Sequence, residues 1–215
     1  MPDFHFEATG ARVLSPALVP TIAIDCNVRN DSPAEKIQTA ILRCQIQIEA
    51  PRRSYSVGEQ NRLRSLFGEP DRWSVTLKPL HWTSVSIVLP AFSNTTLFSL
   101  EVPCTFDIRI AASQYFMGLK DGTAPLTLLF SGSIFSEREA GRLQAFPVSW
   151  KSEARLQFPV ALWKDAVDLY YSNSSFLTLR RDVFERLNAL KVESGLASFE
   201  DVIELMMNNT LATSA

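Results

Sequence analysis

Apolar and polar residues alternate with a period of two through the first two thirds of the chain, and this pattern constrains the fold most. It is clearest in TIAIDCNVRN, residues 21–30, and in ILRCQIQIE, residues 41–49. The apolar positions are Ile22, Ile24, Cys26 and Val28 in the first segment and Leu42, Cys44, Ile46 and Ile48 in the second. Such alternation is typical of half-buried strands in antiparallel sheets, which pack one face and expose the other. The turn residues at 31–36 predict that the two strands form a hairpin.

The longest alternating run, FSLEVPCTFDIRI at 98–110, predicts one long strand. Pro103 has no backbone N–H to donate, so we expect it at a sheet edge or a bulge. Further strands are predicted at 4–7, 82–90, 125–135 and 154–160. Segment 136–146, SEREAGRLQAF, is interpreted as the connection to the C-terminal part of the chain.

Two short helices are predicted between the strands. The first begins at Ser56-Val57-Gly58-Glu59, a capping box in which the serine accepts from a helix-start amide and the glutamate reaches back. Gly68 is a natural end for this helical region. The second helix is predicted at 111–119, before the turn pair Asp121-Gly122.

After residue 146 the apolar residues recur at helical spacing. Helices are predicted at 159–171 and 176–192, where apolar residues lie three or four positions apart. Ser198 is expected to cap a further helix, with Glu200 and Asp201 in its first turn, where the helix dipole favours negative charge.

Strands followed by helices predict the α+β fold class. We expect a mostly antiparallel β-sandwich followed by a C-terminal helical segment. Residues 1–146 would form the sandwich domain with two short helices, 147–209 a strand and helices packed on it, and 210–215 a flexible tail. With 215 residues, 46% of them hydrophobic, the chain can bury a full core.

Charge is balanced, with 21 basic and 23 acidic residues, so the composition predicts no nucleic-acid partner. Basic residues form no cluster that would favour a membrane surface, and no apolar run approaches the roughly 18 residues of a membrane span. The N-terminal residues lack the pattern of a secretory signal. We therefore expect a cytoplasmic protein that binds neither nucleic acid nor membrane.

Residues with catalytic or metal-binding potential are scattered. The three cysteines, Cys26, Cys44 and Cys104, have no CxxC spacing, and all fall on the apolar phase of predicted strands, where buried thiols are inert. His5 and His81 are too far apart to indicate a metal site. Phosphate-binding glycine loops and nucleophile elbows are absent. The sequence thus predicts no cofactor, no metal and no catalytic residue.

The stretch LFGEPDRWSVTLKPLHW, residues 66–82, is a candidate partner-binding loop because tryptophan and arginine dominate interface hot spots. Its candidate contact residues are Asp71, Arg72, Trp73, His81 and Trp82. In the alternative interpretation, Trp73 and Trp82 close the end of the sandwich and the charges are solvated. We favour a structured connection first and a contact surface second.

A second aromatic cluster lies further along the chain. Its members are Trp163, Asp168, Tyr170 and Tyr171. A carboxylate beside aromatic rings can form a pocket for a small molecule or a peptide. The favoured alternative is a helix whose rings pack on the sheet while their polar atoms reach solvent.

The chain resembles an uncharacterised bacterial family of about this length. The resemblance rests on PRRSYSVGEQNRLRSLFGEPDRW at 51–73, LHW at 80–82, VPCTFD at 102–107, YFMGLKDGTAPLTLLFSG at 115–132, PVSWKSEARLQFPVALWKDAVDLYY at 147–171 and LRRDVFERL at 179–187. It covers nearly the whole chain and implies no activity. Genes of the family can lie near those of uptake NiFe-hydrogenases, which implies an accessory or maturation role.

Long amphipathic strands followed by YFMGLKDGTAPLTL at 115–128 also resemble the export chaperone SecB. The favoured hypothesis is a non-enzymatic cytoplasmic accessory protein that binds another protein, which the family resemblance implies is an assembling metalloenzyme such as NiFe-hydrogenase. Two alternatives stay open: a SecB-like chaperone for unfolded chains, and an enzyme without a recognisable motif. Neither the partner nor the oligomeric state follows from the sequence.

Overall fold

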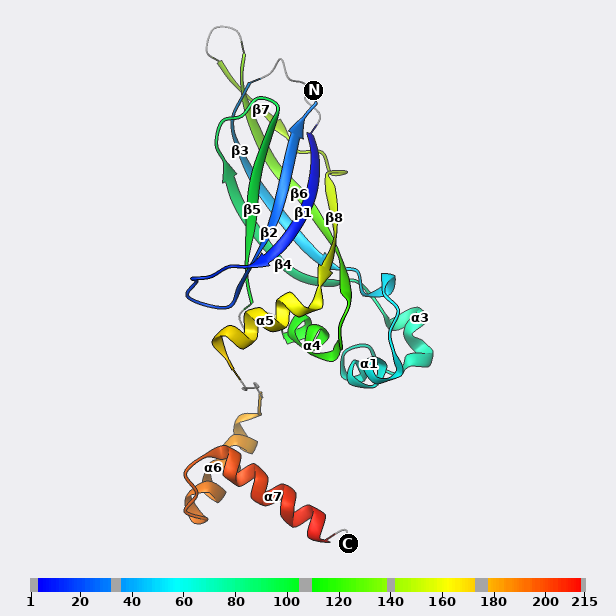
Figure 1. The fold of residues 1–215 in the computed structure, drawn as a ribbon, viewed down its shortest axis with the longest axis vertical. Coiled ribbons are helices and arrows are strands. Elements are labelled where there is room, and N and C mark those ends of the chain that lie inside the picture. The colour runs from blue at the N-terminus through cyan, green and yellow to red at the C-terminus, as the bar shows by residue number, and fades with distance from the viewer. Residues whose placement is uncertain (1–3, 32–35, 105–109, 139–141, 173–177, 214–215) are drawn as a thin grey trace. The chain divides into compact units, whose positions relative to one another are not determined.

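The computed structural model describes residues 4–31, 36–104, 110–138, 142–172 and 178–213 (Figure 1). Internal contacts divide the chain into two units. We call Met1–Ser174 the sandwich unit and Ser175–Ala215 the helical unit, and each is described by itself.

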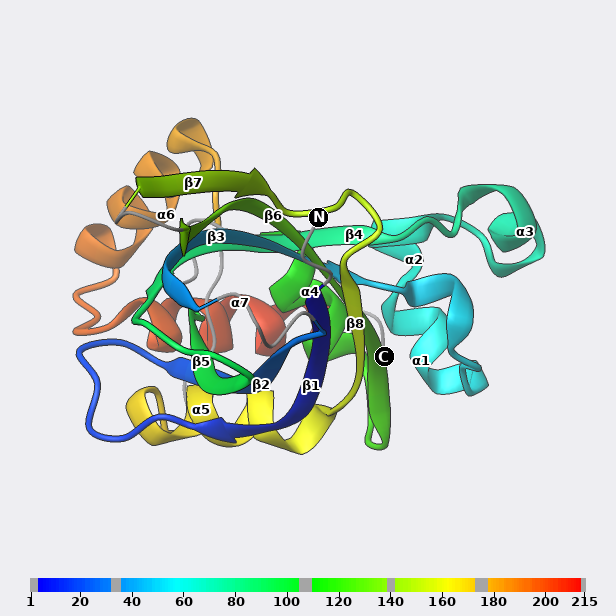
Figure 2. The same cartoon turned by 90° about the horizontal axis from the view of Figure 1, so that it is seen from above.

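Eight strands in the described residues form two antiparallel sheets in the sandwich unit. The first has the order β1-β2-β5 and the second the order β4-β3-β6, with β7 and β8 both paired to β6. Their bounds are β1 (Phe4–Val13), β2 (Thr21–Asn30), β3 (Ile37–Ile48), β4 (Leu80–Leu89), β5 (Thr95–Pro103), β6 (Thr123–Arg138), β7 (Arg142–Pro147) and β8 (Glu153–Pro159). β1 of one sheet runs beside β8 of the other (Figures 1 and 2).

Helices of the sandwich unit gather at one end of the strands in Figure 1. They are the 3-10 turns η1 (Ala50–Arg52) and η2 (Pro70–Arg72) and the helices α1 (Val57–Arg62), α2 (Arg64–Phe67), α3 (Trp73–Thr76), α4 (Ile110–Gly118) and α5 (Val160–Tyr170). The helical unit contains α6 (Arg181–Glu193) and α7 (Phe199–Thr213). The fold is thus α+β, a mostly antiparallel β-sandwich followed by C-terminal helices, as predicted.

Side chains between the two sheets form the core at the positions that the alternation predicted. All eight inward residues of β2 and β3 are buried, as are Leu100 and Val102 in β5. Gly132 in β6 has a φ of +136°, and a Cβ built on it would lie 2.1 Å from the carbonyl oxygen of Ile41 in β3. Only glycine allows β6 to approach β3 so closely at this point.

The predicted hairpin between residues 21–30 and 41–49 is wrong. β2 pairs with β1 and β5, whereas β3 pairs with β4 and β6, so the two strands lie in different sheets. Alternation fixes which face of a strand is buried, but it does not select the neighbouring strand.

The single strand predicted at 98–110 ends early. β5 stops at Pro103, and Ile110 is already the first residue of α4. Residues 105–109 lie outside the described part of the chain. Pro103 is at the end of an edge strand, so its predicted edge position is confirmed.

The described residues of segment 136–146 belong to paired strands rather than to a connection, while residues 139–141 lie outside the described part of the chain. β6 continues to Arg138, and β7 returns along it from Arg142, with Ser136 opposite Gln144. β8 then pairs with the first half of β6. Because of this pairing the structural division falls between Ser174 and Ser175, which differs from the expected boundary at residue 146.

The C-terminal helices also differ in extent from the prediction. α6 begins at Arg181 rather than at residue 176, and α7 continues to Thr213, so residues 210–213 are helical rather than a tail. The predicted helix caps are confirmed: Ser56 and Glu59 form the capping box, and the Asp201 amide donates to Ser198 Oγ at 3.0 Å. Among the described helices, none has the length and apolar character needed to cross a membrane.

Candidate protein-binding site

Trp73, a predicted contact residue, is packed into the sandwich unit. Its indole Nε1 donates a hydrogen bond to the Gly68 carbonyl oxygen at 2.9 Å. Its ring makes edge contacts with Tyr55 and Phe67, at centroid distances of 5.3 and 5.8 Å. Trp73 therefore joins the short helices to the core.

Trp82 and Trp163 are also buried, and both contact the ring of Phe116. The centroid of Phe116 lies 5.0 Å from that of Trp82 and 5.6 Å from that of Trp163. Phe116 in turn contacts Tyr115, which contacts Tyr55 beside Trp73. One aromatic network thus joins Trp73 and Trp82 of the first predicted cluster to Trp163 of the second.

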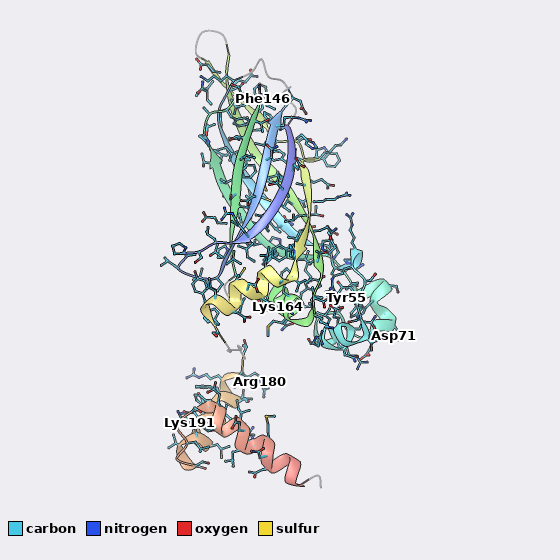
Figure 3. The ribbon with its side chains drawn as sticks, in the orientation of Figure 1. Tyr55, Asp71, Phe146, Lys164, Arg180 and Lys191 are labelled. Carbon is cyan, nitrogen blue, oxygen red and sulfur yellow. The ribbon has the colours of Figure 1, made fainter. Side chains whose placement is uncertain are left out.

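The polar members of the predicted sites lie on different elements. Arg72 is exposed on η2, His81 is exposed on β4, and Asp168 is exposed on α5. Asp71, labelled in Figure 3, is exposed among the short helices. Tyr171 is partly buried at the end of α5.

Tyr170 has an identifiable packing role at the end of α5. Its hydroxyl donates to the carbonyl oxygen of Ala17 at 2.5 Å and accepts from the amide of Ala17 at 3.1 Å. These bonds fasten the connection between β1 and β2 to α5. The Tyr170 hydroxyl therefore makes these hydrogen bonds within the sandwich unit.

A buried ion pair that the sequence analysis missed joins Arg53 to Glu59. Arg53 Nη2 lies 3.0 Å from Glu59 Oε1, and both side chains are largely shielded from solvent. Glu59 also accepts from the amides of Lys120 at 3.0 Å and Ser56 at 2.9 Å. Arg53 donates further to the carbonyl oxygens of Asp121 and Thr123. The pair therefore ties α1 to the turn before β6.

The electrostatics of this pair suit a structural bond rather than proton transfer at neutral pH. Burial by itself would raise the pKa of Glu59, but the hydrogen bonds from Lys120, Arg53 and Ser56 outweigh it and lower the pKa to about 2. Burial and the neighbouring Tyr115 raise the pKa of Tyr55. Glu59 stays ionised and Tyr55 stays protonated across the physiological range, where a general acid or base needs a pKa near 7.

The cysteines of β2 and β3 are buried, as their position in the alternation predicted. Burial, with the nearby charge of Asp25, raises the pKa of the Cys26 thiol to about 12, and burial also raises that of Cys44. Cys104 lies just beyond the end of β5 and is partly buried. Across the described residues, no group of three or more His, Cys, Asp and Glu side chains is placed to hold a metal ion.

Trp150, which the sequence analysis did not single out, is the exposed tryptophan of the sandwich unit. Its side chain is 86% exposed, on the turn between β7 and β8. The turn lies where β6 changes its partner from β8 to β7. The Phe130 amide donates to the Ser152 carbonyl oxygen at 2.9 Å, and the Val148 amide donates to that of Gly132 at 3.0 Å.

Hydrogen bonds within the turn fix its shape as well. The Ser152 amide donates to the Ser149 carbonyl oxygen at 3.0 Å, and the Lys151 amide donates to Ser149 Oγ at 3.3 Å. Lys151 Nζ lies 5.2 Å from the centroid of the Trp150 ring, within the range of a cation–π contact. The turn therefore presents a large apolar ring, with a cation beside it, to solvent.

The residues around Trp150 carried a signal that could have identified it. PVSWKSE places the tryptophan among serines and a lysine, between two segments with strand pattern. Its immediate neighbours are Ser149 and Lys151, a composition typical of a turn between strands. Single exposed apolar side chains are common on protein surfaces, but tryptophan is enriched among interface hot spots, so Trp150 is a candidate contact residue.

The fold is thus that of an α+β sandwich protein with an exposed tryptophan on a hydrogen-bonded turn. The chain matches over residues 1–215 the model of a family of unknown function, DUF6084, and belongs to that family. The comparison with curated proteins returned no match.

Solved structures give only distant similarities. IrmA from Escherichia coli is 11% identical, with 84% of this chain and 99% of IrmA covered at a TM-score of 0.33. A Bordetella pertussis protein designated ApaA is 13% identical, with 74% of this chain and 95% of that protein covered at a TM-score of 0.32. At these TM-scores neither similarity bears on function.

Proposed function

We propose that this protein is a non-enzymatic, cytoplasmic accessory protein that binds another protein through the Trp150 turn. The observation that carries the proposal is the exposure of Trp150 on a hydrogen-bonded turn. The other three tryptophans are buried in the aromatic network, so the chain does not expose such rings indiscriminately.

Rigid presentation is what makes Trp150 a good anchor. A side chain on a mobile loop must be ordered when it binds, and this ordering reduces the affinity. Trp150 stands on a turn that four backbone hydrogen-bond donors fix to β6 and to itself. Its binding energy is therefore available to the complex with little further ordering.

The turn also suggests the chemistry of the partner surface. An indole ring fits an apolar recess, and the Lys151 ammonium beside it favours a carboxylate at the rim of that recess. The family resemblance supports an assembling metalloenzyme, such as NiFe-hydrogenase, as the partner. On this proposal the contact is between proteins, with neither nucleic acid nor membrane involved.

The test is affinity capture of the tagged full chain from its own cells, in parallel with the Trp150→Ala and Val57→Ala variants. Val57 is a matched control because it is an exposed apolar residue of the same unit, on α1. We expect one stoichiometric partner with the wild type and with Val57→Ala, and little or none with Trp150→Ala. Calorimetry with the purified partner should show a Kd weakened by roughly 30-fold or more, as hot-spot tryptophans typically give.

Other outcomes would redirect the proposal. A broad set of unfolded client chains would favour a SecB-like chaperone. Capture that is unchanged by Trp150→Ala would overturn the Trp150 turn as the binding site. No captured protein in any preparation would shift weight to an enzyme without a recognisable motif.

A further inference from the structure

β7 is the outermost strand of the second sheet, and it is paired on one side. It follows β6 in the strand order, and among the described residues no strand pairs with its other side (Figure 2). By contrast, β1 at the border of the first sheet runs beside β8. The outer side of β7 is therefore a free sheet edge.

Hydrogen bonding at the end of β7 identifies the backbone groups that face this free edge. The Val148 amide donates to the Gly132 carbonyl oxygen at 3.0 Å, so the even-numbered residues of β7 direct their backbone groups to β6. Because this direction alternates along an antiparallel strand, the backbone groups of Leu143, Ala145 and Pro147 point away from β6. Proline has no N–H. The free edge thus offers the amides of Leu143 and Ala145 and the carbonyl oxygens of all three residues.

The side chains along this edge do little to prevent pairing with a further strand. Residues 143–147, LQAFP, carry no charge, and Leu143 is 64% exposed. Proteins commonly protect free edges with charged side chains. The border strands β1 and β5 carry such charges, at Glu7, Arg12 and Glu101. β7 instead combines free backbone groups with an exposed apolar side chain, which are the features that strand addition uses.

We propose that an extended segment of the partner protein pairs with the free edge of β7 and continues to the Trp150 turn. This inference rests on the proposed function, because it specifies which part of the partner reaches that turn. Unpaired amides and carbonyl oxygens on alternate residues of a strand match the backbone of another extended chain.

The edge and the tryptophan are close enough to share one occupant. Only Val148 and Ser149 separate Trp150 from the end of β7, so at most about 11 Å of backbone joins the two. A standard protein interface covers roughly 800 Å² of each partner, which is a patch about 30 Å across. A partner centred on Trp150 therefore also covers the edge of β7.

The free groups define the chemistry of the segment. Its residues that bond to Leu143 and Ala145 must have free amides, so proline is excluded at those positions. Apolar or β-branched side chains opposite Leu143 and Ala145 would stabilise the pairing. At Pro147 the edge has no donor, so the paired stretch ends there and the segment turns toward the Trp150 ring. We expect a short, uncharged motif with alternating apolar residues.

The experiment uses a displayed library of random peptides as the probe, selected on the full chain. The selected peptides are then measured against the wild type, Ala145→Pro and Ala145→Ser by fluorescence polarisation. Ala145→Pro removes an outward amide that has no bond to β6, whereas Ala145→Ser keeps this amide and is the matched control. We expect Ala145→Pro to weaken the Kd by about tenfold, because it leaves a peptide carbonyl oxygen unpaired, and Ala145→Ser to leave the Kd unchanged.

A second variant makes the test independent of the proline substitution. Leu143→Lys places a charge on the exposed edge and keeps every backbone amide, so it should fold and should weaken the same peptides. Tryptophan fluorescence shows whether each variant is folded, because all four tryptophans lie in the sandwich unit.

Two results would overturn the proposal. The first is a selection in which no peptide distinguishes Leu143→Lys or Ala145→Pro from Ala145→Ser. The second comes from sedimentation velocity: a wild type with twice the mass of the chain, reduced to one chain by Ala145→Pro, would show that a second copy occupies the edge.

Failure of this proposal is distinguishable from failure of the Trp150 proposal. Partner capture that is lost with Trp150→Ala but unchanged by Ala145→Pro and Leu143→Lys would keep the tryptophan as the contact and remove the edge. Peptide binding that is lost with Ala145→Pro, together with capture unchanged by Trp150→Ala, would keep the edge and remove the tryptophan.

Discussion

The two units differ in how completely they bury aromatic side chains. In the sandwich unit the Phe116 ring is fully buried and contacts the rings of Trp82, Phe158 and Trp163 at 5.0–5.6 Å. In the helical unit Phe184 stays half exposed and has a ring contact with Phe199. A two-sheet core encloses large aromatic rings, whereas among the described residues of the helical unit only Val202 is fully buried. The stability of the whole chain should therefore reside mainly in the sandwich unit.

Truncation of an aromatic side chain should give the largest difference in unfolding free energy between the two units. Phe116→Ala should destabilise the sandwich unit by about 3–5 kcal/mol, the range typical of a buried phenylalanine. Phe184→Ala should leave the same transition unchanged. Urea unfolding followed by tryptophan fluorescence checks both, because every tryptophan reports on the sandwich unit. Equal effects of the two variants would contradict the separation of the units.

Neutralising the buried Glu59 carboxylate should cause the next largest loss of stability. The pKa of Glu59 falls from an ordinary 4.5 to about 2 on folding, so the ionised carboxylate with its hydrogen bonds from Lys120, Arg53 and Ser56 contributes about 3 kcal/mol at neutral pH. A lowered pKa makes this contribution complete above about pH 4.5 and lost as the pH falls through about 2. Glu59→Gln should therefore destabilise at pH 7, and the difference from the wild type should shrink between these values.

Glu69→Gln is the matched control for the buried pair. Glu69 forms an ion pair with Arg64 at 3.2 Å, but both side chains are more than half exposed. Exposed pairs contribute little, so this variant should unfold within about 1 kcal/mol of the wild type at pH 7. A difference between Glu59→Gln and wild type that stays constant down to pH 2 would rule out the electrostatic account.

Features that depend on residues close in the sequence could be predicted, whereas contacts between distant residues could not. The inward positions of β2 and β3 and the capping box of Ser56 and Glu59 depend on neighbouring residues, and the structure confirms them. The partners of β2 are β1, which precedes it, and the distant β5, and alternation within β2 does not specify either, so the predicted hairpin failed. The bond from Lys120 to Glu59 spans 61 residues and left no local signal.

The candidate site shows the same limit. The favoured interpretation of Trp73, Trp82 and Trp163 as packing residues agrees with their burial, but their shared network through Phe116 could not be predicted from spacing. Polar neighbours do not distinguish Trp150 from Trp73, which lies between Arg72 and Ser74, so only its place on a turn between two strands sets it apart. Residues 136–146 were interpreted as a connection, so β7 was not predicted. The turn between β7 and β8 was therefore not recognised.

A substitution at the close contact between β6 and β3 should also destabilise the sandwich unit, but by less than the loss of the Glu59 charge. Gly132→Ala should destabilise by about 2 kcal/mol, since the new Cβ would meet the Ile41 carbonyl and the φ of +136° is strained for any side chain. Gly10→Ala, in β1, is the control because nothing lies within 4 Å of its Cβ position. Thermal unfolding of both variants distinguishes them. A Gly132→Ala chain as stable as Gly10→Ala would show that β6 can move away from β3.

The smallest stability effect is expected at the proposed binding residue. Trp150→Ala should change the free energy of unfolding by less than about 0.5 kcal/mol, because its ring is exposed, while Trp163→Ala should cost about 3–5 kcal/mol. Urea unfolding of the two variants gives the comparison. A large destabilisation by Trp150→Ala would assign the ring a packing role instead of a binding one.

Hydrogen–deuterium exchange on the full chain tests most directly the claim that the sandwich unit contains the stable core of the protein while the helical unit buries little. We expect slow exchange in peptides from β3 and β6, whose inward residues are buried, and fast exchange in peptides from α6 and α7. Protection of α6 and α7 as strong as that of β3 and β6 would contradict the account.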